Sequence, residues 1–325
     1  MAGIWVVAET NPDGTLARSS AELATLARTL AEAASFDAAG VVVAADPAAA
    51  AEELATYLPR VVTVAEPNAA DHAWGAIAAQ RAAEVIDREG DTYVLTGAGP
   101  DGRDVAGTLL GLLDGAVLVN ATAVAWEAGP AVEMSVFGGK LITTSAFTDQ
   151  AGIRIVTVRP NVVNPEPTEA PGKVEAFEPK AGLDLPPVKI VDRLEEAGAA
   201  VSIDDARVIV AGGRGVGGED GFKLMEEIAG LLGGAVGATR AAVDSGWIPY
   251  AQQIGQTGKI VKPRLYLAMG ISGAIQHKVG MQTSETIVAV NRDPDAPIAE
   301  FADMLVIGDL FEVGKALVTE LKARK

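Results

Sequence analysis

Residues 263–312 of the chain read PRLYLAMGISGAIQHKVGMQTSETIVAVNRDPDAPIAEFADMLVIGDLFE. Three short apolar runs lie in this stretch, at 264–270, 286–291 and 304–309, and each ends in a small or polar residue. Short apolar runs that alternate with helical segments predict the parallel strands of an α/β sheet, which binds ligands at the carboxyl ends of its strands. The stretch therefore predicts an open α/β sheet whose small and polar strand ends border a ligand.

The same alternation extends in both directions from this stretch. Further apolar runs at 207–213 and 235–239 predict two more strands, and amphipathic segments predict helices at 221–232, at 273–279 and from 310 to about 323. Together these elements predict a doubly wound, Rossmann-like sheet in the second half of the chain.

The first half of the chain predicts a second α/β domain. Apolar β-branched runs alternate with Ala-rich runs from Gly3 to Arg88, which predicts a mostly parallel sheet, and four extended runs between Ala116 and Pro160 predict antiparallel additions to it. Seven prolines from Pro160 to Pro187 predict an extended connection without its own core. We therefore predict an N-terminal α/β domain over residues 1–187, ending in this Pro-rich linker, and a C-terminal domain over residues 188–325.

Composition excludes several classes of function. The 325 residues suffice for two domains, and the net charge of −17 argues against nucleic-acid binding, which needs clustered Lys and Arg. The chain has no cysteine, hence no disulfide, thiolate nucleophile or iron–sulfur cluster, so redox chemistry requires an organic cofactor. The sequence shows no metal-ligand spacing and no catalytic triad. A strand pattern begins almost at Met1 without a leader, and no apolar run is long enough for a membrane span, so we expect a cytoplasmic protein.

Three glycine-containing segments resemble nucleotide-binding loops. Residues 213–218 (GRGVGG) follow a predicted strand and match G-x-G-x-x-G, whose glycines let backbone N–H groups approach a pyrophosphate. Residues 97–102 (GAGPDG) match it too, and there we favour a plain structural turn. Residues 253–259 (QIGQTGK) fail the P-loop pattern, because Gln253 replaces its first glycine and Ile260 follows the lysine.

Several polar residues at predicted strand ends have both a structural and a functional interpretation. Arg240 is a surface arginine paired with Asp244 one helical turn on, or a fixed positive charge beside a ligand. A lone histidine such as His277, about one turn into its helix, is expected to be a satisfied core or surface residue. Ser272 is expected to cap the helix that begins at Gly273, and Asp309 with Glu312 resembles a capping box at the start of the last helix.

The ISGAIQH run at 271–277, within a match that is dense from Arg207 to Leu321, resembles the electron-transfer flavoprotein alpha subunit family. The resemblance implies one FAD in the C-terminal domain and an N-terminal domain that contacts a beta subunit carrying AMP. It implies an electron carrier rather than a substrate-transforming enzyme, one that accepts electrons from acyl-CoA-type dehydrogenases in fatty acid beta-oxidation. The expected acceptor is a quinone oxidoreductase of the membrane.

The resemblance also implies a role for each site residue. Arg240 lies against the flavin, Thr257 hydrogen-bonds the flavin N5, and His277 donates to the flavin C2 carbonyl oxygen. The remaining cofactor-binding residues are expected to be Arg214, Gly215, Thr239, Gln253, Ile254, Gly255, Gln256, Ser272, Gly273, Ala274, Ile275, Gln276, Asn291, Asp309 and Leu310. Of these, the resemblance places Asn291 and Asp309 beside the adenosine of FAD.

Alternatives remain open at this point. An NAD-dependent oxidoreductase would use the glycine turn at 213–218, and a scaffold protein would keep the fold without the cofactor. The sequence also does not separate a simple carrier from an electron-bifurcating complex, because a second flavin would lie in the partner chain.

Overall fold

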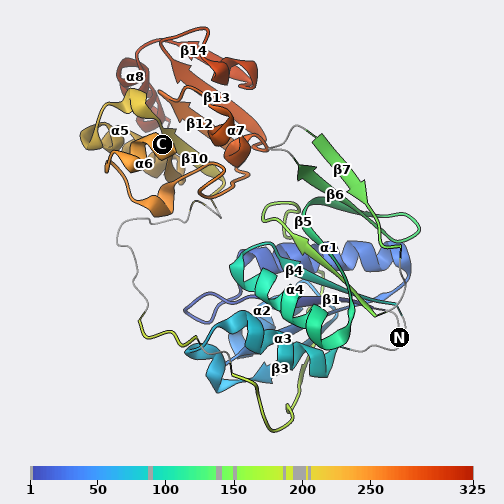
Figure 1. Ribbon diagram of the computed structural model, residues 1–325. Helices are drawn as coiled ribbons and strands as arrows, with labels where there is room; N and C mark the ends of the chain where they lie inside the picture. The colour runs from blue at the N-terminus through green and yellow to red at the C-terminus, as the bar shows by residue number, and fades with distance from the viewer. Residues whose placement is uncertain are drawn as a thin grey trace. The chain divides into compact units, whose positions relative to one another are not determined.

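The structure is a computed structural model that describes residues 3–86, 91–136, 141–148, 152–185, 188–192, 203 and 206–324. The chain divides into two compact units, residues 1–194 and 195–325. Pro187, the last residue of the predicted first domain, lies outside the described residues. Both units are α/β, which confirms the predicted fold class (Figure 1).

The described part of the first unit contains a nine-stranded sheet in the order β7-β6-β5-β8-β4-β1-β2-β3-β9. Its elements are β1 (Gly3–Ala8), α1 (Arg18–Ala34), β2 (Asp37–Ala44), α2 (Ala48–Ala55), β3 (Arg60–Ala65), α3 (Trp74–Val85), β4 (Thr92–Gly97), α4 (Pro100–Leu113), β5 (Gly115–Trp126), β6 (Pro130–Val136), β7 (Leu141–Ser145), β8 (Ile153–Val158) and β9 (Lys173–Ala176).

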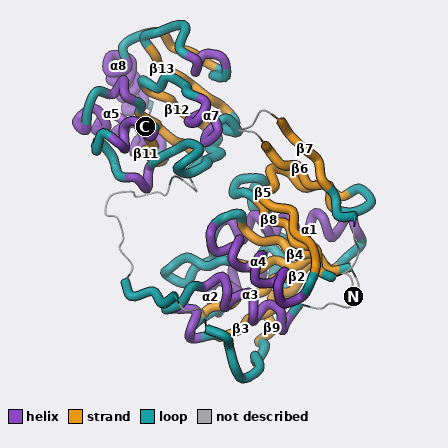
Figure 2. The backbone as a smooth tube through the Cα atoms, viewed as in Figure 1, coloured by secondary structure: helices purple, strands orange, loops and turns teal. Residues whose placement is uncertain are grey.

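Helices cover both faces of this sheet (Figure 2). Residues of α1 and α2, such as Leu26 and Leu54, form one core with one face of the sheet, and residues of α3 and α4, such as Ala78 and Leu109, form a second core with the other face. All six residues of β1 are buried. A strand buried on both faces requires a continuous apolar run, and the GIWVVA sequence supplies it.

The prediction of antiparallel additions is correct for β5, β6 and β7, which form two antiparallel pairs, and wrong for β8. β5 pairs with β6, and β6 with β7, in antiparallel register, whereas β8 lies between β4 and β5 and is parallel to both. The burial of the strands gives the reason. All six residues of β8 are buried, as expected of a central parallel strand, whereas four of the five residues of β7 are exposed.

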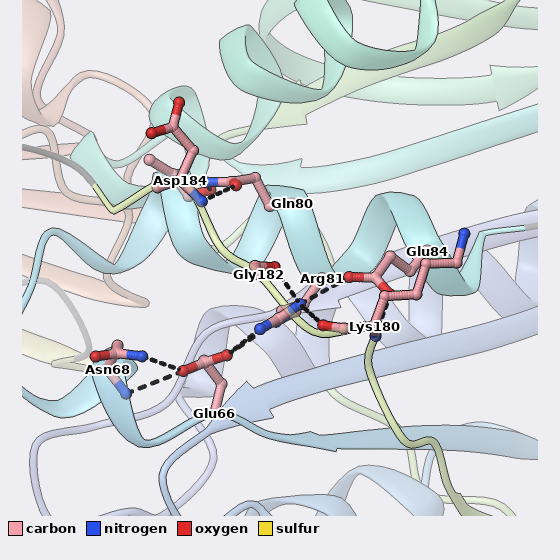
Figure 3. A network of polar contacts seen from close by, with 9 residues as sticks. Glu66, Asn68, Gln80, Arg81, Glu84, Lys180, Gly182 and Asp184 are labelled. Carbon is pink, nitrogen blue, oxygen red and sulfur yellow. Dashed lines mark hydrogen bonds and ion pairs between the residues drawn. The ribbon is translucent and has the colours of Figure 1, made fainter.

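The described part of the predicted Pro-rich connection, residues 160–185, contributes a strand to the sheet of the first unit. β9 pairs in parallel with β3 and forms the edge of the sheet. Beyond β9, side chains of α3 bind the backbone of residues 180–184, as Figure 3 shows. Arg81 donates to the carbonyl oxygen of Lys180 (3.0 Å), and Gln80 exchanges two hydrogen bonds with the backbone of Asp184 (2.8 and 3.0 Å).

The second unit contains a five-stranded sheet in the order β11-β10-β12-β13-β14, in which all described pairings are parallel. The chain crosses from one side of β10 to the other between β11 and β12, so β10 and β12 flank the topological switch point. Its elements are β10 (Val208–Gly212), α5 (Glu219–Leu232), β11 (Ala235–Ala238), α6 (Arg240–Asp244), β12 (Leu265–Met269), α7 (Ile275–Met281), β13 (Thr286–Asn291), β14 (Met304–Ile307) and α8 (Leu310–Ala323).

Candidate functional site

A cavity of about 650 Å³ lies at the carboxyl edge of the second sheet. Residues that follow four of the strands line it: Gly213 after β10, Thr239 after β11, Gly270 after β12 and, at the end of β13, Asn291. This is the edge at which open α/β sheets bind ligands, and the volume lies within the range of small-molecule sites.

Most of the predicted cofactor-binding residues line this cavity. The structure places thirteen of them there: Arg214, Gly215, Thr239, Arg240, Ile254, Gly255, Gln256, Thr257, Ser272, Ala274, Gln276, His277 and Asn291. Five others do not line it: Gln253, Gly273, Ile275, Asp309 and Leu310. Sequence reasoning missed eight lining residues: Gly213, Ala241, Asp244, Gly270, Ile271, Asp293, Ala296 and Pro297. Position directly after a strand was a usable signal for Gly213 and Gly270.

The glycine turn at 213–217 brings the ends of β10 and β12 together. The Gly213 amide donates to the Met269 carbonyl oxygen (3.1 Å) and the Gly215 amide to the Gly270 carbonyl oxygen (3.0 Å). A Cβ on Gly213 would collide with the Gly270 carbonyl oxygen, and one on Gly215 would lie 2.8 Å from the Gly270 Cα. These glycines therefore serve the close approach of two loops, and their N–H groups are already committed within the protein, which counts against a pyrophosphate cradle of the NAD type.

Thr239 carries an unsatisfied polar atom at the cavity. Its hydroxyl oxygen is buried and has no hydrogen-bond partner. A buried hydroxyl without a partner costs free energy, so such a group at a cavity wall is suited to bind a polar ligand.

Arg240 begins α6 and forms an exposed ion pair with Asp244 (Nε–Oδ2 3.2 Å), as its structural interpretation predicts. Both residues also line the cavity, so the pair and a ligand role are compatible. The two side chains are 66% and 61% exposed, and an exposed pair of this kind holds its partners weakly. The guanidinium is thus free to turn toward a ligand.

The loop that carries Thr257 is held by hydrogen bonds from the residues before it and from α7. Gln253 Nε2 donates to the Thr257 hydroxyl oxygen (3.1 Å), and the Tyr250 hydroxyl donates to the Thr257 carbonyl oxygen (2.6 Å). The Gln256 amide donates to the Gln276 carbonyl oxygen at the start of α7 (2.7 Å). Because the Thr257 hydroxyl accepts from Gln253, its own proton remains available for donation into the cavity. Gln253 thus does not line the cavity but holds the lining residue Thr257 by a hydrogen bond.

His277 is buried, and both of its ring nitrogens have partners within the protein. Nδ1 lies 3.0 Å from the Ile254 carbonyl oxygen, and Nε2 lies 2.9 Å from the Tyr266 hydroxyl. Burial lowers the pKa of His277 to about 4, so the ring is neutral at pH 7. Its predicted donation to a ligand carbonyl therefore requires a different proton arrangement, and it stays a prediction.

The expected helix cap at Ser272 is wrong. Helix α7 begins two residues later than predicted, its N-cap is Ala274, and no side chain caps it. The Ser272 carbonyl oxygen instead accepts from the Ile298 amide (3.0 Å), and Gly273 adopts a φ of +85° in the turn that makes this contact. Ser272 is left exposed on the cavity wall.

Asn291 fixes the turn after β13. Its amide donates to the Ile271 carbonyl oxygen (2.9 Å), and its Oδ1 accepts from the Asp293 amide (3.0 Å). The side chain thus holds two lining loops together, and its predicted adenosine contact is untested.

Asp309 caps α8, as its capping-box interpretation predicts. Its Oδ1 accepts from the amides of Phe311 (2.8 Å) and Glu312 (3.1 Å). Its Oδ2 pairs with Arg292, and this hydrogen bond holds the pKa of Asp309 below its usual value. Both oxygens thus have partners away from the cavity.

The second glycine motif, at 97–102, forms a tight turn between β4 and α4. A Cβ on Gly102 would collide with the Gly97 carbonyl oxygen, so the helix crosses the strand end at close range. The Glu9 carboxyl lies against both glycines. Its Oε1 is buried without a partner, and burial raises its pKa to about 7. These contacts support the structural-turn interpretation.

The part of the chain that the structure describes contains neither a metal-binding cluster nor a membrane-spanning helix. No group of three or more His, Cys, Asp or Glu side chains there is placed to hold a metal ion. None of the described helices has the length and apolar character that crossing a bilayer requires.

Comparisons with known proteins match both units. The family described as "Electron transfer flavoprotein domain" matches residues 4–181, and that described as "Electron transfer flavoprotein FAD-binding domain" matches residues 202–282. The electron transfer flavoprotein subunit alpha of Mycobacterium leprae is 40% identical over 333 residues, and that of Mycobacterium tuberculosis is 41% identical over 331 residues; each alignment covers 100% of both chains. The subunit of the same name from Thermoanaerobacterium thermosaccharolyticum is 36% identical, with 99% of this chain and 98% of that one covered.

Proposed function

The chain belongs to the electron transfer flavoprotein alpha subunit family, and from this premise we propose that its cavity at the carboxyl edge of the second sheet holds the FAD of an electron carrier. The cavity is the observation that carries the proposal. Much of its wall, from Gly213 to His277, lies within the region matched by the FAD-binding domain.

The residues present fit a flavin dinucleotide. The unpartnered Thr239 hydroxyl offers a hydrogen bond to a polar ligand atom, and Arg214 and Arg240 offer positive charge to an anionic one. FAD, when bound, supplies the redox chemistry, which this cysteine-free chain does not otherwise contain.

The chain's own residues would bind and orient the cofactor. Arg240 holds a permanent positive charge at the cavity, and positive charge favours whichever state of a ligand is more negative. Thr257 directs its free hydroxyl proton toward the cavity from a loop that Gln253 and Tyr250 hold in place. His277 contacts the same loop at the Ile254 carbonyl oxygen.

The first unit serves the assembly in this proposal. It would contact a beta subunit that carries AMP, and the complex would act in the cytoplasm. Its electrons would come from primary dehydrogenases, acyl-CoA dehydrogenases among them, and pass to a membrane quinone oxidoreductase. These donors, the acceptor and the AMP follow from the resemblance.

The test is co-expression of this chain with its beta subunit, followed by counts of FAD and AMP per heterodimer. We expect one FAD and one AMP, reduction of the flavin by an acyl-CoA dehydrogenase with its substrate, and no reduction by NADH alone.

Three outcomes would contradict the proposal. A colourless complex would favour a scaffold, and bound nicotinamide without flavin would favour a dehydrogenase. Two flavins with direct reduction by NADH would indicate an electron-bifurcating complex.

A further inference from the structure

Tyr266 of β12 is fully buried, and its hydroxyl lies against a residue that lines the cavity. The residue is 0% exposed and is one of the largest fully buried side chains among the described residues. Its hydroxyl has one hydrogen-bond partner, the Nε2 of His277 at 2.9 Å. A buried tyrosine hydroxyl usually finds a partner, but here the partner is a titratable ring at the wall of the proposed cofactor site.

The contacts of His277 determine where its proton lies. The Ile254 carbonyl oxygen can only accept, so the Nδ1 that lies 3.0 Å from it carries a proton. In the neutral ring Nε2 is then an acceptor, so the Tyr266 hydroxyl donates to it. Burial raises the pKa of Tyr266 well above its usual value, which keeps the hydroxyl protonated and able to donate.

The ring in turn holds the cavity loop on α7. The side chain of His277 reaches the backbone of Ile254, the first of the loop residues that line the cavity before Thr257. Backbone contacts complete the attachment: the Gln256 amide donates to the Gln276 carbonyl oxygen (2.7 Å), and a Cβ on Gly280 would collide with the Gly255 nitrogen. The loop thus lies directly on α7, and His277 contributes the side-chain hydrogen bond.

We propose that Tyr266 is a positioning residue for the cofactor site, which holds His277 in the Nδ1–H tautomer and thereby fixes the loop that presents Gln256 and Thr257. The inference rests on the proposed function of the cavity, because positioning matters only where a ligand is bound. Tyr266 itself does not line the cavity. It acts through His277, whose orientation would otherwise be set by one hydrogen bond instead of two.

The test uses the heterodimer with this chain labelled with ¹⁵N-histidine. The chain has only two histidines, so the His72→Gln variant assigns the ring signals of His277. In the wild-type complex we expect a protonated Nδ1 and an unprotonated Nε2 that do not titrate between pH 6 and pH 8. In Tyr266→Phe we expect the Nε2 resonance to move and some Nε2–H tautomer to appear. Hydrogen-exchange mass spectrometry of the same variant should show about tenfold faster amide exchange in the loop that contains Gln256.

Tyr250→Phe is the matched control, since its hydroxyl also bonds this loop, at the Thr257 carbonyl oxygen, without contacting His277. It should speed loop exchange and leave the His277 ring signals unmoved. If Tyr266→Phe unfolds, the ring signals of the wild-type complex decide alone, because the inference requires a protonated Nδ1 and an unprotonated Nε2 there.

Flavin content is counted first, because a complex without flavin contradicts the proposed function rather than this inference. With flavin bound, an Nε2–H or doubly protonated ring in the wild type would overturn the inference. Ring signals and loop exchange unchanged in Tyr266→Phe would also overturn it.

Discussion

Arg81 and Glu66 form a buried ion pair in which both Nε (2.8 Å) and Nη2 (2.6 Å) of the arginine donate to one carboxylate oxygen. The two side chains are 7% and 4% exposed. The remaining arginine nitrogen, Nη1, donates to Glu84 and to the Lys180 carbonyl oxygen, so the pair also fastens the segment after β9 to α3 (Figure 3).

Arg81→Met should therefore destabilise the first unit by about 3 kcal/mol, because it leaves the Glu66 carboxylate buried without a cation. Residues 178–185 should also become sensitive to limited proteolysis. Urea unfolding and protease digestion measure the two effects. Arg324→Gln, which breaks an exposed pair with Glu320, is the control and should change neither.

Glu9→Gln should remove a pH dependence from the stability of the first unit. Burial raises the pKa of Glu9 from 4.5 to about 7, so folding favours the protonated form. Its contribution is therefore fully present below pH 4.5 and is lost as the pH rises through 7, by roughly 3 kcal/mol. Glu9→Gln should be more stable than the wild type at pH 8, with the advantage vanishing near pH 5. Equal pH profiles of unfolding for the two proteins would contradict this, and the exposed Glu32→Gln serves as control.

Gly215→Ala should disturb the junction of β10 and β12, because its Cβ would lie 2.8 Å from the Gly270 Cα. We expect FAD to bind at least tenfold more weakly, since both loops line the cavity. Gly218→Ala in the same turn is the matched control, because a Cβ there meets nothing within 4 Å. Fluorescence titration of FAD against both variants measures the difference; equal affinities would show that the close approach is unimportant.

Thr239→Val should weaken FAD binding without lowering the stability of the flavin-free protein. The hydroxyl has no partner in the protein, so its loss should leave the flavin-free protein as stable as the wild type, or more so. FAD affinity should fall by about tenfold if the hydroxyl binds the cofactor. Thermal unfolding with and without FAD separates the two effects, and Thr319→Val on α8 is the control. Unchanged affinity for FAD would show that the Thr239 hydroxyl does not bind the cofactor.

Arg240→Gln should lower the midpoint potential of the bound flavin, because the more negative reduced state loses a fixed positive charge. If the substitution changes the equilibrium constant of one-electron flavin reduction tenfold, the midpoint potential shifts by about 59 mV. Spectroelectrochemical titration gives the shift, with Arg264→Gln, outside the cavity lining, as the reference. Asp244→Asn should shift the potential upward, because it removes the anion that pairs with Arg240.

The positions of the cavity residues could be predicted largely from strand ends. Thr239, Gly270 and Asn291 all lie where an apolar run stops, and parallel strands bring their carboxyl ends to one edge. The place of β8 could not be predicted from spacing, because the order of strands depends on which residues become buried after folding. Its uninterrupted IRIVTV run was the available signal for a central strand.

The hydrogen-bond partners of individual side chains were harder to predict from the sequence than the positions of the strand ends. Tyr266 precedes His277 by eleven residues on a different element, and no periodic pattern pairs a strand residue with a helix residue at that separation. The cap expected at Ser272 was wrong because it also depends on a contact with a distant segment. Gly273 packs against Ile298, in the loop before β14, and α7 begins only at Ile275.

β7 ends the strand order of the first sheet, and its outer edge pairs with no other described strand. Leu141 and Ile142 are 55% and 68% exposed on it. A bare edge with apolar side chains is a template for adding a strand from another molecule. The chain produced without its partner is therefore expected to self-associate as its concentration rises, and Ile142→Lys should keep it monomeric in light scattering.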